Sequence, residues 1–198
     1  MIAGELLPGE IGRPGLPAAR APRVAEIVAS AHDLLEHEGP EALSMRRLAA
    51  RVGIRAPSLY KHFSSKAAVE LALIEDALLE SGEVGHRAIH QPGADGPLVS
   101  LLSAYRRHAL AHPNLYRLAT RGGLARDQLA PGLEEWAGNP WYVVTGDEFL
   151  AQALWSYAHG MVTLELDRRY PPGSDLDRTW AVGADAFERA ARTGAPGT

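Results

Sequence analysis

Apolar residues recur at helical spacing near the start of the chain. Between residues 24 and 35 they follow one another at intervals of one and three positions, which places them on one face of an amphipathic helix. They are Val24, Ile27, Val28, Ala31, Leu34 and Leu35. Gly39 and Pro40 follow directly and are typical of a helix end.

Three further helices are predicted before residue 90. Ser44 is a good N-cap for a short helix that Gly53 closes. Pro57 suits the first turn of a third helix, running to about His62, because the N–H that proline lacks is not needed there. A longer fourth helix is predicted over about residues 66–85, after a capping serine.

The second part of the chain follows a cluster of helix breakers at residues 91–97. Its pattern predicts a helix over 98–111 and a short helix just after Pro113. Three more helices are predicted over about 128–136, over 147–170 and over 175–192. No stretch of any length alternates as a strand does, so we predict an all-α fold. The charge changes sign after the cluster, which favours a domain boundary within or just before it.

The first 22 residues are rich in glycine and proline and show no apolar periodicity. This composition predicts a mobile arm. Arg13 and Arg20, with Arg23 at the border, could reach into a DNA minor groove, as basic arms do. A solvated tail is the simpler interpretation, and we favour it.

Composition narrows the function classes. The chain has 198 residues, 46% of them hydrophobic and 22% charged, enough to fold around one sizeable core or two small ones. It has no cysteine, which excludes disulfides, thiolate metal sites and a cysteine nucleophile. No apolar run reaches the roughly 18 residues that cross a bilayer, and Glu5 and Glu10 stand where a signal peptide would be basic. We therefore expect a cytoplasmic protein.

Positive charge is concentrated in one short segment. Residues 42–66 contain six basic residues and no acidic one, on a chain whose formal net charge is −4. The six are Arg46, Arg47, Arg51, Arg55, Lys61 and Lys66. A basic segment on an acidic protein is typical of a DNA-reading element joined to a domain with another task.

This segment has the chemistry of a helix-turn-helix. The small Ala49 lets two helices approach, Gly53 supplies a left-handed turn residue, and Ile54 and Leu59 fill the space between the helices. The remaining outward positions carry Arg55, Ser58, Tyr60, Lys61 and His62. A short helix with these side chains is sized to enter the major groove, where base edges can be distinguished.

The segment resembles the N-terminal domain of the TetR family of transcriptional regulators over roughly residues 23–75. That family has a Leu-Tyr-x-His-Phe motif followed by a lysine that starts the fourth helix. Here the motif residues are Leu59, Tyr60, His62, Phe63 and Lys66. The resemblance implies phosphate contacts for Ser44, Tyr60, His62 and Lys66 and positions near the base edges for Arg55, Pro57, Ser58 and Lys61. Phe63 is expected to pack between the helices instead.

The resemblance also implies a division of the chain. We expect a mobile arm over residues 1–22, a DNA-binding domain over 23–66, a helical effector-binding and dimerisation domain over 67–192, and a flexible tail over 193–198.

The helix predicted over 147–170 has two informative faces. An apolar stripe includes Phe149 and Leu154, while Trp155 and His159 share the opposite face. The sequence Trp155-x-x-x-His159-Gly160 resembles a TetR-like subset named for Trp, His and Gly. Family members dimerise through their last two long helices, which implies a homodimer through 147–170 and 175–192. The last helix carries an apolar stripe of Leu176, Trp180, Ala184 and Phe187.

Candidates for a ligand pocket combine aromatic area with polar tips. They are Tyr105, His108, His112, Leu118, Trp155 and His159, and each is also a plausible core or interface residue. His108 and His112 have the i, i+4 spacing of a metal site, but two ligands are too few without a third from elsewhere. We expect no metal and no cofactor.

Three functions can be weighed. The first is a ligand-responsive repressor that binds a palindromic operator as a homodimer and is released by a small-molecule effector. The second is a DNA-binding dimer whose second domain serves only dimerisation or protein docking. An enzyme is disfavoured, because Glu134, Glu135 and the scattered histidines form no recognisable catalytic arrangement.

Overall fold

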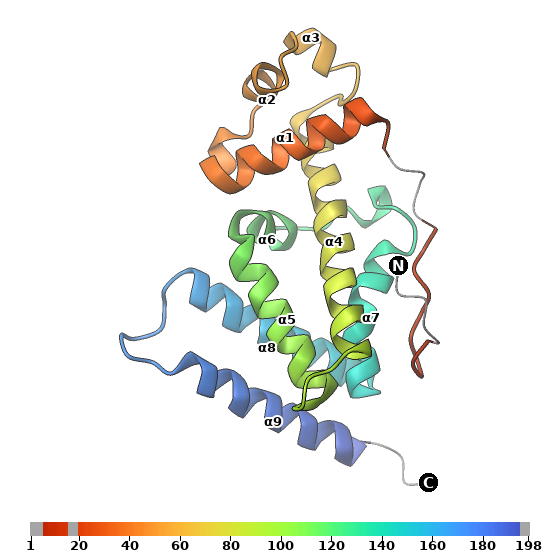
Figure 1. The fold of residues 1–198 in the computed structure, drawn as a ribbon, viewed down its shortest axis with the longest axis vertical. Helices are drawn as coiled ribbons and strands as arrows, with labels where there is room; N and C mark the ends of the chain where they lie inside the picture. Colours follow the sequence, from red (N-terminus) through yellow and green to blue (C-terminus); the bar gives the residue numbers. More distant parts are fainter. Residues whose placement is uncertain (1–5, 16–19, 195–198) are drawn as a thin grey trace. The chain divides into compact units, whose positions relative to one another are not determined.

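The computed structural model describes residues 6–15 and 20–194, and within them it is all helical with no strand. The α-helices are α1 (Pro22–Glu38), α2 (Met45–Arg51), α3 (Ala56–Leu59), α4 (Lys66–His90), α5 (Gly96–Ala111), α6 (Pro113–Thr120), α7 (Leu133–Thr145), α8 (Glu148–Leu166) and α9 (Leu176–Gly194) (Figure 1). Two short 3-10 helices, η1 (Pro40–Ala42) and η2 (Arg126–Gln128), lie between them. No helix in this part of the chain is long and apolar enough to cross a membrane.

The chain forms two compact units. The head unit comprises residues 14–80 and 112–134, and the body unit comprises residues up to 13, 81–111 and from 135 onward. Helix α4 is continuous and contributes to both. The residue ranges of the two units differ from the predicted domain boundaries. Those domain boundaries remain a prediction.

The head unit is built around the three-helix element and the first half of α4. Ser44 caps α2 by accepting a hydrogen bond from the Arg47 N–H at 3.3 Å, and Gly53 takes a φ of +72° in the turn. Leu59 is fully buried, and Phe63 is buried in the same core, as expected. Leu115 of α6 completes this core.

The third and fourth helices differ in length from their predicted bounds. Only Ala56–Leu59 of the third helix is α-helical, and turns that include the His62 N–H to Leu59 carbonyl bond continue it. Helix α4 extends to His90 instead of ending near Gly85, because Ile89 is a core residue of its last turn.

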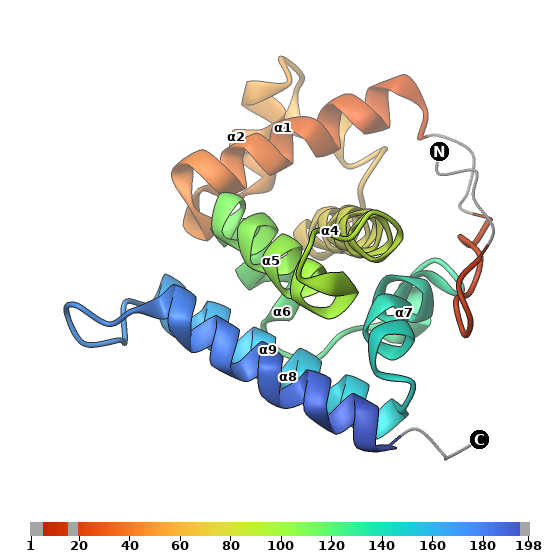
Figure 2. The same ribbon diagram turned by 60° about the horizontal axis from the view of Figure 1, so that its bottom comes forward.

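The body unit packs α5 against α8 and α9. Helices α8 and α9 run antiparallel and side by side (Figures 1 and 2). Asp147 caps α8 by accepting a hydrogen bond from the Leu150 N–H at 2.8 Å. The inward face of α8 holds Leu154 and Val162, whereas Phe149, predicted in that stripe, is 72% exposed in its first turn.

Helix α7 contains a proline, Pro140, and extends beyond its predicted end at residue 136. Pro140 has no N–H, so the Trp136 carbonyl four residues earlier lacks its helical donor. His86 of α4 supplies one, with its Nε2 at 3.0 Å from that oxygen. Because the carbonyl is satisfied from outside the helix, α7 accommodates the proline and runs to Thr145.

The described part of the N-terminal stretch is held in place, which differs from the mobile arm that composition predicted. Glu10 contacts His86 and His90 of α4 with its carboxylate, and Asn139 of α7 bonds the backbone of Gly9 and Ile11 at 3.0 Å each. These polar contacts replace the apolar periodicity that the stretch lacks. Residues 1–5 and 16–19 of the arm, and 195–198 of the predicted tail, lie outside the described residues.

The arginines of this stretch are also paired. Arg13 forms an ion pair with Glu83 at 2.8 Å in the body unit, and Arg20 contacts Asp76 at 2.6 Å in the head unit. Arg23 contacts Glu26 at 2.5 Å. Their acidic partners compete with the minor-groove role that was considered for them.

Candidate nucleic-acid interface and ligand cavity

Helix α3 and the residues on either side of it present polar side chains to solvent. Arg55 is the N-cap residue of α3, and Tyr60, at its C-terminal end, is 51% exposed despite its aromatic ring. Of the eight residues predicted to bind DNA, six are exposed: Arg55, Pro57, Tyr60, Lys61, His62 and Lys66. Ser44 and Ser58 are half-buried. Their contacts with DNA stay a prediction.

The basic residues of this element fall into two groups. Arg47 pairs with Glu38, Arg51 lies 3.5 Å from the same carboxylate, and Lys66 pairs with Glu70 at 3.3 Å. Arg55 and Lys61 form no ion pair with any residue that the structure describes. Their charges are therefore available to an external anion.

Arg46 belongs to this second group and was not singled out from the sequence. It is exposed in the first turn of α2 and has no ion-pair partner among the described residues. The basic run alone cannot separate Arg46 from Arg47, because only the fold shows which arginine meets Glu38.

The body unit contains a groove of about 650 Å³ between the second half of α4, the following loop and α5. Arg87, Arg107 and His108 bring basic chemistry to its wall, and Ser100 and Ser103 add hydroxyls. Asp95 is the acidic residue of the lining. A groove of this size and polarity suits a small polar ligand.

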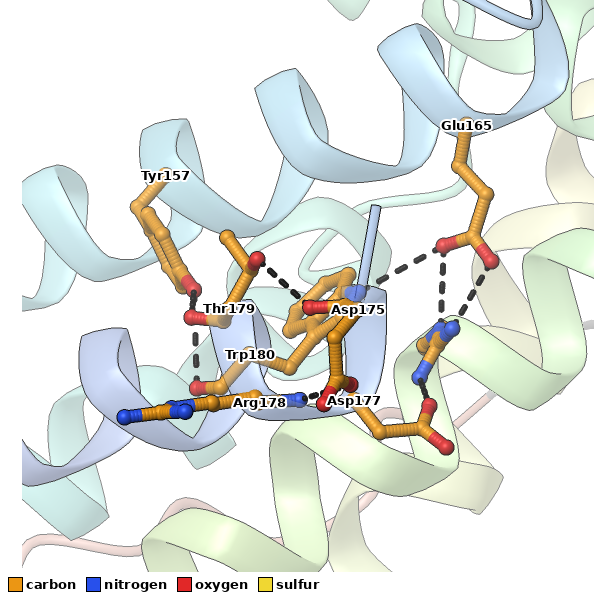
Figure 3. A network of polar contacts seen from close by, with 8 residues as sticks. Tyr157, Glu165, Asp175, Asp177, Arg178, Thr179 and Trp180 are labelled. Carbon is orange, nitrogen blue, oxygen red and sulfur yellow. Dashed lines mark hydrogen bonds and ion pairs between the residues drawn. The ribbon is translucent and has the colours of Figure 1, made fainter. Parts of the chain in front are cut away.

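The apolar stripe of α9, which belongs to the helix pair expected to form the dimer interface, packs against α8 of the same chain. Trp180 and Ala184 are buried, and Trp180 donates its indole N–H toward Glu165 of α8 at 3.4 Å (Figure 3). The Tyr157 hydroxyl donates to the Thr179 carbonyl at 3.1 Å, and burial raises the pKa of this tyrosine. Helices α8 and α9 are thus joined within one chain.

Both helices also expose large apolar side chains in the single chain. Val182 of α9 is 62% exposed, and Trp155 and Leu164 of α8 are exposed as well. Exposed apolar side chains of this size are candidates for contact with another protein surface.

Two family profiles match the chain. That of bacterial regulatory proteins of the tetR family matches residues 27–73, and that of the tetracyclin repressor-like C-terminal domain matches residues 98–187. An uncharacterized HTH-type transcriptional regulator of Mycobacterium tuberculosis is 30% identical over 156 residues, covering 71% of this chain and 68% of that protein. The chain belongs to the TetR family.

Solved structures share the TetR-family fold. A protein of unknown function from Rhodococcus sp. RHA1 superposes with a TM-score of 0.69 at 24% identity, over 87% of this chain and 97% of that one. A TetR variant from Acinetobacter baumannii AYE, in complex with minocycline, gives a TM-score of 0.60 at 20% identity, over 86% and 97%. At these identities the likeness concerns the fold alone.

TetR-family members are non-enzymatic transcription factors with a DNA-binding helix-turn-helix and a ligand-binding C-terminal domain. The resemblance inferred from the sequence motif is therefore confirmed, and the enzyme hypothesis is excluded.

The six ligand candidates of this TetR-family chain are divided between the two units. Tyr105 is buried edge-on against Trp141, beside a void of about 10 Å³ that His108 also borders. His108 also lines the larger groove. His112 and Leu118 belong to the head unit, where Leu118 packs against the core of the three-helix element.

The remaining two candidates stack on each other on α8. The rings of Trp155 and His159 are 5.5 Å apart and nearly parallel, and burial lowers the pKa of His159. Trp155 is exposed in the single chain. Ligand contact by any of the six stays a prediction.

Proposed function

We propose that the protein is a ligand-responsive repressor that binds a palindromic operator as a homodimer in the cytoplasm and is released by a small-molecule effector. The observation that carries the proposal is the pair of exposed, unpaired cations on the short reading helix, Arg55 and Lys61. A surface cation without an acidic partner loses little when it moves from water to a nucleic acid.

The eight predicted DNA contacts divide by chemistry. Ser44, Tyr60, His62 and Lys66 offer hydroxyl, imidazole and ammonium donors that suit phosphate oxygens. Arg55, Pro57, Ser58 and Lys61 lie along the short helix that would enter the major groove. Arg46, in the first turn of α2, adds a further candidate for a phosphate contact.

Dimerisation is supported by the large apolar side chains that α8 and α9 expose in the single chain. In a twofold dimer the same surface of each copy meets, so Val182 of α9 would be covered by the corresponding surface of a second copy. Two reading helices about one DNA turn apart, roughly 34 Å, would then match a palindrome.

Effector binding is supported by the groove between α4 and α5. Arg87 and Arg107 point to an effector with a negative charge, held further by the serine hydroxyls. Release requires the effector to bind the DNA-incompetent arrangement more tightly, by about 1–3 kcal/mol of coupling. The alternative function, a DNA-binding dimer without an effector, assigns no ligand to this groove.

The DNA-binding role is tested with fragments flanking the protein's own gene, titrated at two salt concentrations. We expect Arg55→Ala to weaken binding to the preferred palindrome by about ten- to a hundredfold, because a guanine contact is worth about 1–3 kcal/mol. Lys66→Ala should weaken binding to all sequences and reduce the salt dependence, as loss of a phosphate contact does.

The matched control is Arg121→Ala, which removes an exposed arginine that follows α6 and is not among the predicted DNA contacts. It should leave DNA affinity unchanged. Equal affinity of Arg55→Ala, Lys66→Ala and the unaltered protein for every fragment would contradict the proposed reading surface.

A further inference from the structure

Three metal-ligating side chains converge in the head unit. His32 and Glu36 lie one turn apart on α1, and His112 is the N-cap residue of α6. One ligand atom from each lies within 4.8 Å of the other two, and the two imidazole rings are 5.9 Å apart. All three residues are half-buried. The DNA-reading and effector roles use neither His32 nor Glu36.

We propose that His32, Glu36 and His112 bind a divalent transition-metal ion, with zinc as the best match. Two imidazoles and one carboxylate are a ligand set that zinc accepts, with water in the fourth position. Zinc holds such atoms about 2.0–2.2 Å away, which brings neighbouring ligand atoms to roughly 3.4 Å. Small side-chain rotations of half-buried residues can supply this closure.

The backbone around the cluster already orients Glu36. Its carboxylate accepts the Leu115 N–H at 2.5 Å and the Asn114 N–H at 3.4 Å, and the Asn114 amide donates to the Glu36 carbonyl at 3.1 Å. A carboxylate has about four acceptor positions, so these bonds leave room for an ion. Such outer contacts fix the direction of a metal ligand before the ion arrives.

Helix capping alone is the competing explanation for Glu36, but it does not account for the two histidines beside it. His112 starts α6, whose Leu115 is buried in the same core as α1. An ion held by the three residues would therefore tie α1 to the start of α6. It would stabilise the folded head unit by mass action, because the unfolded chain does not hold the three ligands together.

The test uses the full-length protein freed of metal and titrated with zinc against a chelating dye of known affinity. We expect one zinc per protomer and a rise in the melting temperature with zinc. His32→Gln and His112→Gln should each lower zinc affinity by more than about a hundredfold, beyond the usual cost of losing an outer-shell partner.

His37→Gln is the matched control, since His37 is exposed on the same helix and lies outside the cluster. It should bind zinc like the unaltered protein. Zinc-dependent shifts of the His32 and His112 imidazole resonances in the unaltered protein test the ligands without any substitution. Absence of saturable binding, or unchanged affinity in both glutamine variants, would overturn the proposal.

Discussion

Val182→Glu is expected to turn the proposed dimer into a monomer and to weaken operator binding by at least about a hundredfold. Val182 is an apolar residue of α9 that is 62% exposed in the single chain. In a twofold interface the same residue enters from both subunits, so the substitution buries two unpaired carboxylates. A monomer also loses the effective concentration that links two half-sites, which is worth about 10²–10⁴ in avidity.

Analytical ultracentrifugation measures the oligomeric state of the Val182→Glu variant. DNA titrations measure its affinity for a palindrome and its affinity for an isolated half-site. Val182→Ala serves as control, because it keeps the helix and an apolar side chain at this position. The glutamate variant should still bind the half-site like the unaltered protein. A glutamate variant that remains dimeric at micromolar concentration would place the interface elsewhere.

Glu10→Ala is expected to destabilise the body unit by about 3 kcal/mol, because it leaves buried hydrogen-bonding groups without their partner. The Glu10 side chain is 3% exposed and meets His86 Nδ1 at 2.5 Å and His90 Nε2 at 2.9 Å. The other ring nitrogen of His86 contacts the Trp136 carbonyl at 3.0 Å, so both nitrogens of this buried ring are engaged. Without Glu10, His86 Nδ1 loses its buried partner. The melting temperature should fall by about 6–12 °C.

The loss should depend on pH. Burial favours the neutral acid, but hydrogen bonds from the Leu7 N–H, His86 and His90 outweigh it and hold the pKa of Glu10 below its ordinary value. A lowered pKa contributes stability above the unfolded value of about 4.3, and this contribution disappears as pH falls through the folded value. Glu10→Gln should therefore differ most from the unaltered protein above about pH 5 and converge with it in acid.

Urea unfolding between pH 3 and 7 measures this convergence. Glu83→Gln is the control, since Glu83 forms a half-exposed ion pair with Arg13 that is worth at most about 1 kcal/mol. A constant difference between the Glu10→Gln variant and the unaltered protein down to pH 3 would show that ionisation of Glu10 does not stabilise the fold.

The DNA-reading element is the part of the fold that could be predicted most fully. Its signals are local: Ser44 caps a helix, Gly53 turns the chain, and Leu59 fills the core within a few residues of each other. The exposure of Tyr60 follows from the same spacing.

Features that depend on distant partners could not be found in this way. The N-terminal stretch lacks apolar periodicity, and Glu10 is instead held by histidines 76 and 80 positions later. The inward packing of Trp180 against Glu165 needs the register of α8 and α9, which no single-helix pattern supplies. Likewise, the partners of His112 lie on α1 and not beside it in the sequence.

The proline in α7 couples the residues that positions 86 and 140 can accept. As long as residue 140 is proline, the Trp136 carbonyl needs a donor from outside its own helix, and His86 is that donor. A residue with an N–H at 140 would return this bond to the helix, and position 86 would then be constrained by its contact with Glu10 and no longer by this carbonyl. Substitutions at 86 and 140 are therefore epistatic, and tolerance at one position depends on the residue at the other.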